Sequence, residues 1–225
     1  MDGSNPMVGP APEDRFPSLS AVTLLVVDVQ NDFAHERGKS SALGADLVSA
    51  RKAVESINRL IAAARGLRLP VVYLRTEHSL LTDRPNFKAR YVVRGFDPEN
   101  LLCAAGTWGA ELYEDLAPPS EGEAVVTKYG YDGFQDTCLD AVLNNRGTRT
   151  LVVTGLVTNL CVQTTVEHAF ALGYEVIIVE DATAGDDLAA QKAALTNLGK
   201  YFGTVVGTRE VLESWNQTPV SGRQP

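Results

Sequence analysis

Short apolar runs that alternate with helical segments most constrain the fold of this chain. The run AVTLLVVDV at residues 21–29 is rich in β-branched residues, which is typical of a strand buried on both faces. Residues 47–67 instead carry apolar side chains at three- and four-residue spacing and end near Gly66, which predicts a helix. Further strands are expected at 70–76, 123–128, 150–155, 174–181 and 203–208, and further helices at 137–147, 161–173 and 187–202.

This alternation predicts the fold class. Strands that alternate with helices form a parallel sheet covered on both faces, so we expect an α/β, three-layer α/β/α domain with a six-stranded, mostly parallel sheet. The domain is expected to span residues 20–213, between a flexible N-terminal arm (1–19) and a flexible C-terminal tail (214–225). Residues 77–122 are less regular, and we expect them to cover the site and to form part of an oligomer surface.

Charge and cysteine usage exclude several classes of function. The chain has 20 basic and 28 acidic residues, a net charge of −8, which disfavours nucleic acid and anionic membranes as partners. Three widely spaced cysteines without a CxxC pair disfavour a disulfide framework, and the N-terminus lacks the pattern of a signal peptide. We therefore expect a cytoplasmic protein. The three histidines are scattered, so we expect no metal and no cofactor.

Three chemically capable side chains fall at the ends of predicted strands. Asp28 ends the first strand, Lys128 ends the third, and Cys161 follows the fourth. Ligands of open α/β sheets bind beyond the carboxyl ends of the strands. Taken alone, the acid is as readily a cap, whereas the lysine is more often a solvated surface residue and the cysteine more often a buried core thiol. Their position on one edge of one predicted sheet favours a catalytic group over these separate roles.

The chemistry of the three residue types is complementary. A free thiol has a pKa of about 8.5, and a helix N-terminus and a nearby ammonium both favour the thiolate. Cys161 would lie at a helix N-terminus, and Lys128 would supply the ammonium. Asp28 would accept the thiol proton and pass it to a leaving amine. The loop LVTNLC would supply backbone N–H groups to the oxyanion, which describes an amidase-type acyl transfer without a metal.

The chain resembles the isochorismatase-like family of cysteine hydrolases, and most closely its ureidoacrylate, biuret and carbamoylsarcosine amidohydrolase branch. The resemblance covers about residues 20–208 and rests on LLVVDVQNDF, GTWGAEL, VVTKYGYDGFQDTCLD, TGLVTNLCVQTTVEHAFALGY and VIIVEDATA. It implies a catalytic triad of Asp28, Lys128 and Cys161. It also implies a cis peptide at Leu156–Val157, with the N–H groups of Val157 and Cys161 as the oxyanion hole. A homo-oligomer, dimer or tetramer, is implied as well.

The resemblance also suggests the substrate class. Nicotinamidases carry metal-binding Asp and His residues after the second strand, where this chain reads RTEHS with Thr76 in place of the aspartate. His78 is expected to be an ordinary polar loop residue. We therefore expect a metal-independent cysteine amidohydrolase that cleaves a C–N bond of a small ureido, carbamoyl or carboxamide substrate through a thioester and releases ammonia. Alternatives are a nicotinamidase and a non-catalytic relative acting as a binding module.

Aromatic residues are candidates for the walls of the substrate pocket. Phe33 matches a pocket aromatic of the family, and the other candidates are Trp108, Tyr129, Tyr131 and Phe134, each of which is as readily a core or subunit contact. The candidate arginines for pairing with a substrate carboxylate are Arg75, Arg90 and Arg94. The remaining polar and thiol residues are expected to have no special role: Asn31 and Asp32 in an ordinary turn, Gln191 on an exposed helix face, and Cys103 and Cys138 as inert thiols.

Overall fold

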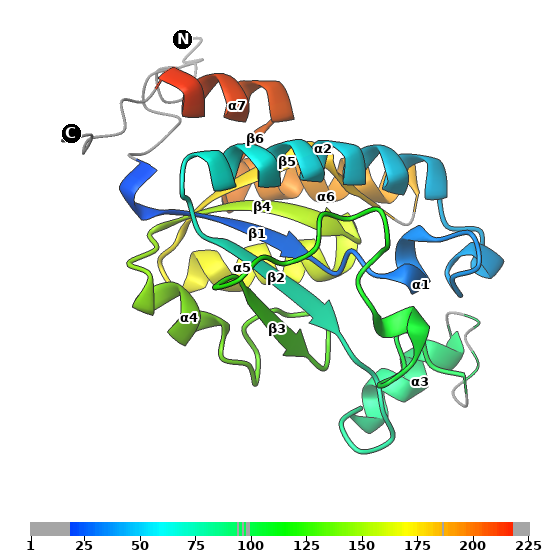
Figure 1. Ribbon diagram of the computed structural model, residues 1–225. Helices are drawn as coiled ribbons and strands as arrows, with labels where there is room; N and C mark the ends of the chain where they lie inside the picture. Colours follow the sequence, from blue (N-terminus) through cyan, green and yellow to red (C-terminus); the bar gives the residue numbers. More distant parts are fainter. Residues whose placement is uncertain (1–18, 94, 96, 98–99, 186, 218–225) are drawn as a thin grey trace, which may run out of the picture.

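The fold is a single parallel sheet between two layers of helices (Figure 1). The computed structural model describes residues 19–93, 95, 97, 100–185 and 187–217. Every paired strand in this part of the chain is parallel, in the order β3-β2-β1-β4-β5-β6, which confirms the predicted architecture. The strands are β1 (Val22–Val27), β2 (Val71–Thr76), β3 (Ala124–Lys128), β4 (Thr150–Leu156), β5 (Glu175–Ala184) and β6 (Thr204–Val206).

Alternation along the central strands builds two separate cores. Leu24 and Val26 of β1 pack with the apolar face of α2, whereas Leu25 and Val27 pack on the opposite side of the sheet. Because all six residues of β1 are buried, the strand needs apolar side chains on both faces. The helices α2 (Leu47–Gly66) and α7 (Thr208–Gln217) cover one face, and α4 (Leu139–Asn145), α5 (Gln163–Ala171) and α6 (Leu188–Tyr201) cover the other.

The carboxyl ends of β1 and β4 approach each other closely at Gly155. This residue has φ of 122°, and a Cβ atom there would lie 2.0 Å from the carbonyl oxygen of Val27. Only glycine fits such a position without moving the neighbouring backbone. The loop that carries Cys161 therefore leaves β4 directly beside the end of β1.

The structure differs from the sequence-based boundaries at both ends of the domain. The tail expected from residue 214 begins inside α7, which runs to Gln217 and buries Trp215 against the core. At the other end Leu19, expected in the arm, lies in the 3-10 helix η2 (Leu19–Ala21). The rest of the expected arm, residues 1–18, and the tail from residue 218 lie outside the described residues. In the described part of the chain no helix is long and apolar enough to cross a membrane.

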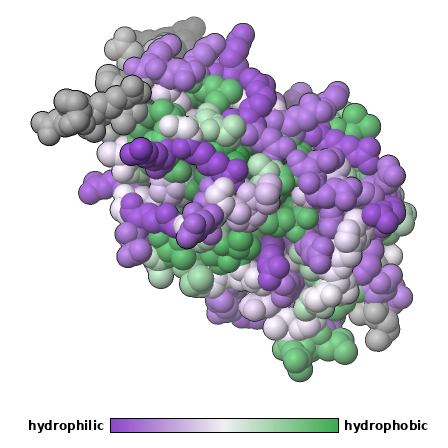
Figure 2. Space-filling model, viewed as in Figure 1, coloured by the Kyte–Doolittle hydropathy of each residue, from purple (hydrophilic) through white to green (hydrophobic). Residues whose placement is uncertain are grey.

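Residues 77–122, hereafter the cover segment, contain two helical elements that the sequence did not indicate. These are α3 (Pro85–Val93) and the 3-10 helix η4 (Trp108–Ala110). Tyr91, Leu101 and Leu102 form a small core of their own beside Phe33. Figure 2 shows hydrophobic atoms at the lower tip of the molecule, where the loop before α3 lies in the same view. The exposed large apolar side chains in the described part of the cover segment are Leu80, Leu81, Val92, Val93 and Trp108.

Candidate active site

The carboxyl ends of β1, β3 and β4, hereafter the sheet edge, bring Asp28, Lys128 and Cys161 into contact. Asp28 follows β1, Lys128 ends β3, and Cys161 lies in the single helical turn η5 (Thr158–Val162) after β4. The Lys128 Nζ atom lies 2.7 Å from Asp28 Oδ2 and 3.4 Å from Cys161 Sγ. All three residues are buried, so the group forms a compact cluster shielded from solvent.

Lys128 contacts both other residues of this cluster. Its ammonium also donates a hydrogen bond of 2.6 Å to the carbonyl oxygen of Gly130, two residues further along the chain. Asp28 adopts a left-handed φ of 49°, a conformation that aspartate tolerates better than most residues. A buried lysine without an acidic partner would lose its charge, so the contact with Asp28 is what keeps the ammonium charged here.

Burial and charge act against each other in this cluster. Burial, the largest effect, raises the pKa of the Cys161 thiol to about 12, and Lys128 offsets this only in part. Burial alone would lower the pKa of Lys128, but attraction to Asp28 and Cys161 raises it above its usual value. The nearby ammonium therefore favours the thiolate, as expected from the sequence, but by less than burial disfavours it.

The turn around Cys161 has an unusual backbone. The peptide bond Leu156–Val157 is cis, as the family resemblance implied. The carbonyl oxygen of Val157 accepts hydrogen bonds from the N–H groups of Leu160 and Val162, which closes a π-helical turn ahead of α5. Cys161 therefore lies in this turn, and the regular helix begins two residues later at Gln163. Val157 and Cys161 both face the same cavity, which keeps their role as an oxyanion hole open as a prediction.

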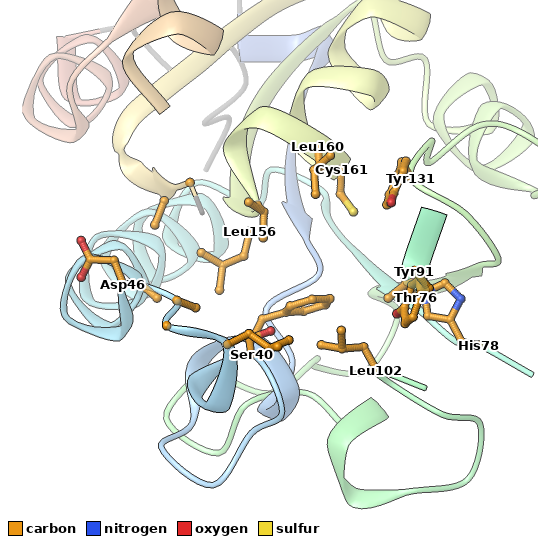
Figure 3. A pocket seen from close by; sticks show the side chains of 18 of the residues that line it. Ser40, Asp46, Thr76, His78, Tyr91, Leu102, Tyr131, Leu156, Leu160 and Cys161 are labelled. Carbon is orange, nitrogen blue, oxygen red and sulfur yellow. The ribbon is translucent and has the colours of Figure 1, made fainter. Parts of the chain in front are cut away.

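A cavity of about 180 Å³ opens beside Cys161, and most of its wall is apolar (Figure 3). The apolar lining comes from several separate parts of the chain and includes Phe33, Phe87, Tyr91, Leu102, Leu156 and Leu160. The polar lining includes Ser40, Asp46, Thr76, His78 and Tyr131. A small apolar chamber with a few polar groups is the usual form of a small-molecule site.

The cavity contains only some of the predicted wall residues. Phe33 and Tyr131 line it. Trp108 does not, because its ring lies edge-on to His35 at 5.0 Å, with the Arg37 guanidinium 4.8 Å from the ring centre.

Tyr129 and Phe134 also lie outside the cavity lining. The Tyr129 side chain is exposed. Phe134 packs between His168 and Tyr174 in the core below α5. The prediction that these two residues and Trp108 form the wall of the cavity is wrong in this structure, because Trp108 and Phe134 pack against other rings and the Tyr129 side chain is exposed.

The cover segment supplies wall residues that the sequence analysis did not single out. Phe87 and Tyr91 are one helical turn apart on α3, and Leu102 follows in the next loop. Their contribution to the cavity confirms that the cover segment lies over the site. The four-residue spacing of two aromatic residues after Pro85 was the one local signal for this helix face.

His78 is a buried wall residue, which corrects its interpretation as an ordinary polar loop residue. Its Nδ1 atom lies 2.9 Å from Asp83 Oδ1, and its ring stacks on Phe87 with 4.7 Å between ring centres. Burial lowers the pKa of His78 although Asp83 opposes the shift, so the ring is neutral near pH 7. Within the described residues, no group of three or more His, Cys, Asp or Glu side chains is arranged to hold a metal ion.

The residues after Asp28 join the sheet edge to the cover segment. Gln30 donates hydrogen bonds to the carbonyl oxygens of Thr76 and Ala110, both at 2.8 Å, and accepts one from the Thr76 N–H. Asn31 donates to the Trp108 carbonyl at 2.9 Å.

Asp32 completes this set of links. Its carboxylate accepts the Cys103 N–H at 2.7 Å and the Lys39 N–H at 3.1 Å. The interpretation of Asn31 and Asp32 as ordinary turn residues is therefore wrong, because both hold residues more than seventy positions away.

The structure also shows the surroundings of the other candidate residues. Arg75 pairs with Glu77 and donates to Thr127, and Arg90 is exposed outside the cavity, whereas the side chain of Arg94 lies outside the described residues. Gln191 is not on an open helix face, since its amide contacts the Thr183 carbonyl and the Gly185 N–H. Cys103 and Cys138 are both free, the first buried and the second exposed.

Comparison with known proteins agrees with this architecture. Residues 22–210 match the Isochorismatase domain family. A ureidoacrylate amidohydrolase RutB of Klebsiella pneumoniae is 35% identical over 194 residues, covering 81% of each chain. The crystal structure of a cysteine hydrolase from Pseudomonas syringae pv. phaseolicola aligns with a TM-score of 0.78 at 30% identity, covering 94% of this chain and 100% of that chain. N-carbamoylsarcosine amidase from Thermoplasma acidophilum aligns with a TM-score of 0.67 at 30% identity, covering 84% and 96%. The chain therefore belongs to the isochorismatase family of hydrolases.

Proposed function

We propose that this protein is a cysteine amidohydrolase that cleaves a C–N bond of a small ureido, carbamoyl or carboxamide substrate. The observation that carries the proposal is the contact of Lys128 with both Asp28 and Cys161, together with the position of Cys161 in the wall of the cavity. A nucleophile, a proton acceptor and a fixed positive charge are the parts that thiol-dependent acyl transfer needs. The names of the relatives, a ureidoacrylate amidohydrolase and an N-carbamoylsarcosine amidase, support the same class of substrate.

The proposed reaction has two halves. Cys161 gives its proton to Asp28 as its sulfur attacks the substrate carbonyl carbon, and Lys128 stabilises the developing thiolate. The oxyanion is held by the N–H groups of Val157 and Cys161. Asp28 then protonates the leaving nitrogen, the C–N bond breaks, and ammonia departs from a thioester. Water then attacks the thioester with Asp28 as base. The acid product is released, and the thiol of Cys161 is regenerated.

The proposed chemistry uses no metal. The position that would offer an aspartate ligand in a nicotinamidase carries Thr76, and the Nδ1 atom of His78 is already engaged by Asp83. The intact buried cluster also disfavours a purely binding role, because an unused buried ion pair costs several kcal/mol of desolvation. Activity that is unchanged in the presence of a chelator would agree with this assignment. Activity that is lost in chelator and restored by added metal would favour the nicotinamidase alternative.

The partners and location follow from the same proposal. We expect a small amide or ureide as the substrate and a homo-oligomer as the working form, with the exposed Leu80, Leu81, Val92 and Val93 near α3 as a contact surface. Three free cysteines fit a reducing cytoplasm.

Ammonia release from a panel of ureas, N-carbamoyl amino acids and nicotinamide tests the proposal. The Cys161→Ala variant is expected to bind the best substrate and to release no ammonia above background, with an unchanged circular dichroism spectrum. The Cys138→Ala variant, which removes an exposed thiol outside the cavity, serves as the control and is expected to keep full activity. Equal turnover by wild type and Cys161→Ala would overturn the nucleophile assignment.

A further inference from the structure

Charge is distributed unevenly around the cavity. The described lining residues include one carboxylate, that of Asp46, and no lysine or arginine. Three basic side chains next to lining residues lie within ion-pair distance of a carboxylate: Lys39 of Asp32, Arg75 of Glu77 and Lys128 of Asp28. The two charges of such a pair largely cancel at a distance. The unbalanced charge that a ligand meets in the described part of the cavity is therefore acidic.

Asp46 occupies the start of α2, where the helix would otherwise attract an anion. Its carboxylate accepts hydrogen bonds from the backbone N–H and the hydroxyl of Ser49, at 3.0 and 2.6 Å. These bonds lower the pKa of Asp46, so the carboxyl group is charged near neutral pH. A helix N-terminus attracts anions because its first N–H groups lack partners inside the helix. Here the protein's own carboxylate takes that place, and a substrate carboxylate would meet a like charge.

His78 offers the cavity a hydrogen-bond acceptor. The ring is neutral and its Nδ1 atom lies 2.9 Å from Asp83 Oδ1, so Nδ1 carries the proton and Nε2 keeps a lone pair. The Asp83 side chain is fully buried and its Oδ2 atom has no hydrogen-bond partner, so solvent hardly screens its charge. An N–H or O–H group of a substrate would satisfy Nε2, whereas a carboxylate would be repelled by both residues.

Asp46 and the His78–Asp83 pair lie on opposite sides of the nucleophile. Figure 3 shows Asp46 at the left of the labelled residues and His78 at the right, with Leu156 and Cys161 between them. The wall that joins the two sides is mostly apolar. A substrate whose carbonyl carbon is held at Cys161 can extend in either direction, and it approaches negative charge in both.

We propose that this cavity selects its substrate by charge: it accepts amides or ureides whose remaining part is uncharged or cationic, and it rejects those that carry a carboxylate. The inference rests on the proposed amidohydrolase function and narrows its substrate class. Ureido and carbamoyl acids are poor substrates on this account, although the reacting C–N bond is the same. An apolar chain fits the wall, and an ammonium group at its end is attracted by Asp46 or Asp83.

The test uses three amides of similar length that differ in the end group. Valeramide is uncharged, γ-aminobutyramide carries an ammonium, and glutaramate carries a carboxylate. Each amide is used to protect Cys161 from iodoacetamide near neutral pH, and mass spectrometry of the Cys161 peptide yields a dissociation constant whether or not the amide is hydrolysed. Glutaramate is expected to bind about tenfold more weakly than valeramide, and γ-aminobutyramide at least as tightly as valeramide. Ammonia release is expected to follow the same order.

Removing either acid tests the cause of this preference. Asp83→Asn keeps an acceptor for the Nδ1–H of His78 and is expected to narrow the ratio between glutaramate and valeramide by about fivefold. Asp46→Asn keeps a good helix cap and is expected to narrow the ratio by about twofold, because solvent screens this partly exposed charge. Asp187→Asn is the matched control, since Asp187 caps α6 in the same way but lies outside the cavity lining. Its ratio is expected to equal that of wild type.

Glutaramate that binds wild type as tightly as valeramide would overturn the inference, as would failure of valeramide to protect Cys161 at all. An unchanged ratio in both Asp83→Asn and Asp46→Asn would do the same. A preference for glutaramate that Arg94→Gln abolishes would also overturn it, and would assign the carboxylate to the Arg94 side chain, which lies outside the described residues. Equal ammonia release by wild type and Cys161→Ala is a separate failure, which refutes the proposed amidohydrolase function and leaves the binding ratios standing.

Discussion

The sheet edge and the cover segment form opposite sides of one cavity but are held in place by different means. Asp28, Lys128 and Cys161 follow directly from strands that are locked in register. The cover segment is instead attached by separate contacts. Asn31 donates to the Trp108 carbonyl, Asp32 accepts the Cys103 N–H, and single backbone hydrogen bonds join Asn31 to Glu111 and Tyr113 to Val29. The difference indicates that continuous strand pairing positions the sheet edge, whereas the position of the cover segment depends on a few separate contacts.

Replacing Lys128 by Met disrupts the sheet edge, and this variant is expected to change activity and stability the most. The change leaves Asp28 buried without its counter-ion, which is expected to cost about 3–5 kcal/mol of stability. It also removes the group that lowers the pKa of the Cys161 thiol, so that pKa is expected to rise and alkylation of the thiol to slow at every pH. Ammonia release is expected to fall by about 10²- to 10³-fold.

Arg65→Met is the matched control for this prediction. It breaks the ion pair between Arg65 and Glu123, which is 2.8 Å long and lies away from the cavity. Stability is expected to fall but kcat to remain near that of wild type. An alkylation rate that does not move in Lys128→Met would remove the electrostatic role of the lysine.

Replacing Phe87 by Ala tests the cover segment and is expected to have an intermediate effect. The variant removes an aromatic ring from the wall of the cavity, so KM is expected to rise about tenfold while kcat changes little. Trp108→Ala removes a ring of the same segment that lies outside the cavity, and its kinetics are expected to stay within about twofold of wild type. Steady-state kinetics of the two variants that showed the opposite ranking would contradict the assigned wall.

Replacing Asp32 by Asn weakens the link between the two regions. Hydrogen bonds to a charged acceptor contribute about 1.5–3 kcal/mol, so the backbone around Cys103 is expected to open more often. Hydrogen exchange at the Cys103 amide should accelerate, with a rise of a few-fold in KM.

Asp181→Asn offers the comparison for this link, because Asp181 makes similar bonds to Thr208 at the start of α7. It is expected to lower stability without changing exchange at Cys103. Unchanged exchange at Cys103 in the Asp32 variant would show that the cover segment is held by other contacts.

The buried His78 predicts a small dependence of stability on pH. Its pKa is lowered on folding, mainly by burial, so the folded protein binds this proton less readily than the unfolded chain. The contribution to stability is therefore full above the unfolded pKa of about 6.5 and is lost as the pH falls below it. Thermal unfolding between about pH 7 and 5 is expected to show a shallower acid loss in His78→Gln than in wild type. If wild type and His78→Gln lost stability equally over this pH range, His78 would not be the source of the pH dependence.

The sequence predicted the sheet edge well because its features are local. The end of a continuous apolar run indicates where a buried strand ends, and parallel strands bring their ends together, so the meeting of Asp28, Lys128 and Cys161 followed from pattern alone. The raised pKa of the Cys161 thiol did not follow, because burial depends on everything that packs around the sulfur.

The walls of the cavity were predicted less well for the same physical reason. Trp108 and Phe134 are aromatic residues near the motifs, yet distant partners turn them toward His35 and Tyr174. Phe87 reaches the cavity because α3 folds back over the sheet edge, an arrangement held by contacts between residues far apart in the chain. Such contacts leave little trace in local sequence patterns.

Mass spectrometry of the enzyme quenched during turnover can locate the acyl group on the chain. With a terminal carbamoyl substrate, the peptide containing Cys161 is expected to gain the mass of the acyl group left after loss of ammonia. Peptides with Cys103 or Cys138 are expected to stay unmodified, and the adduct should vanish in Cys161→Ala. Ammonia release at the full rate by Cys161→Ala, or an acyl group found on another residue, would contradict the assignment of Cys161 as the nucleophile.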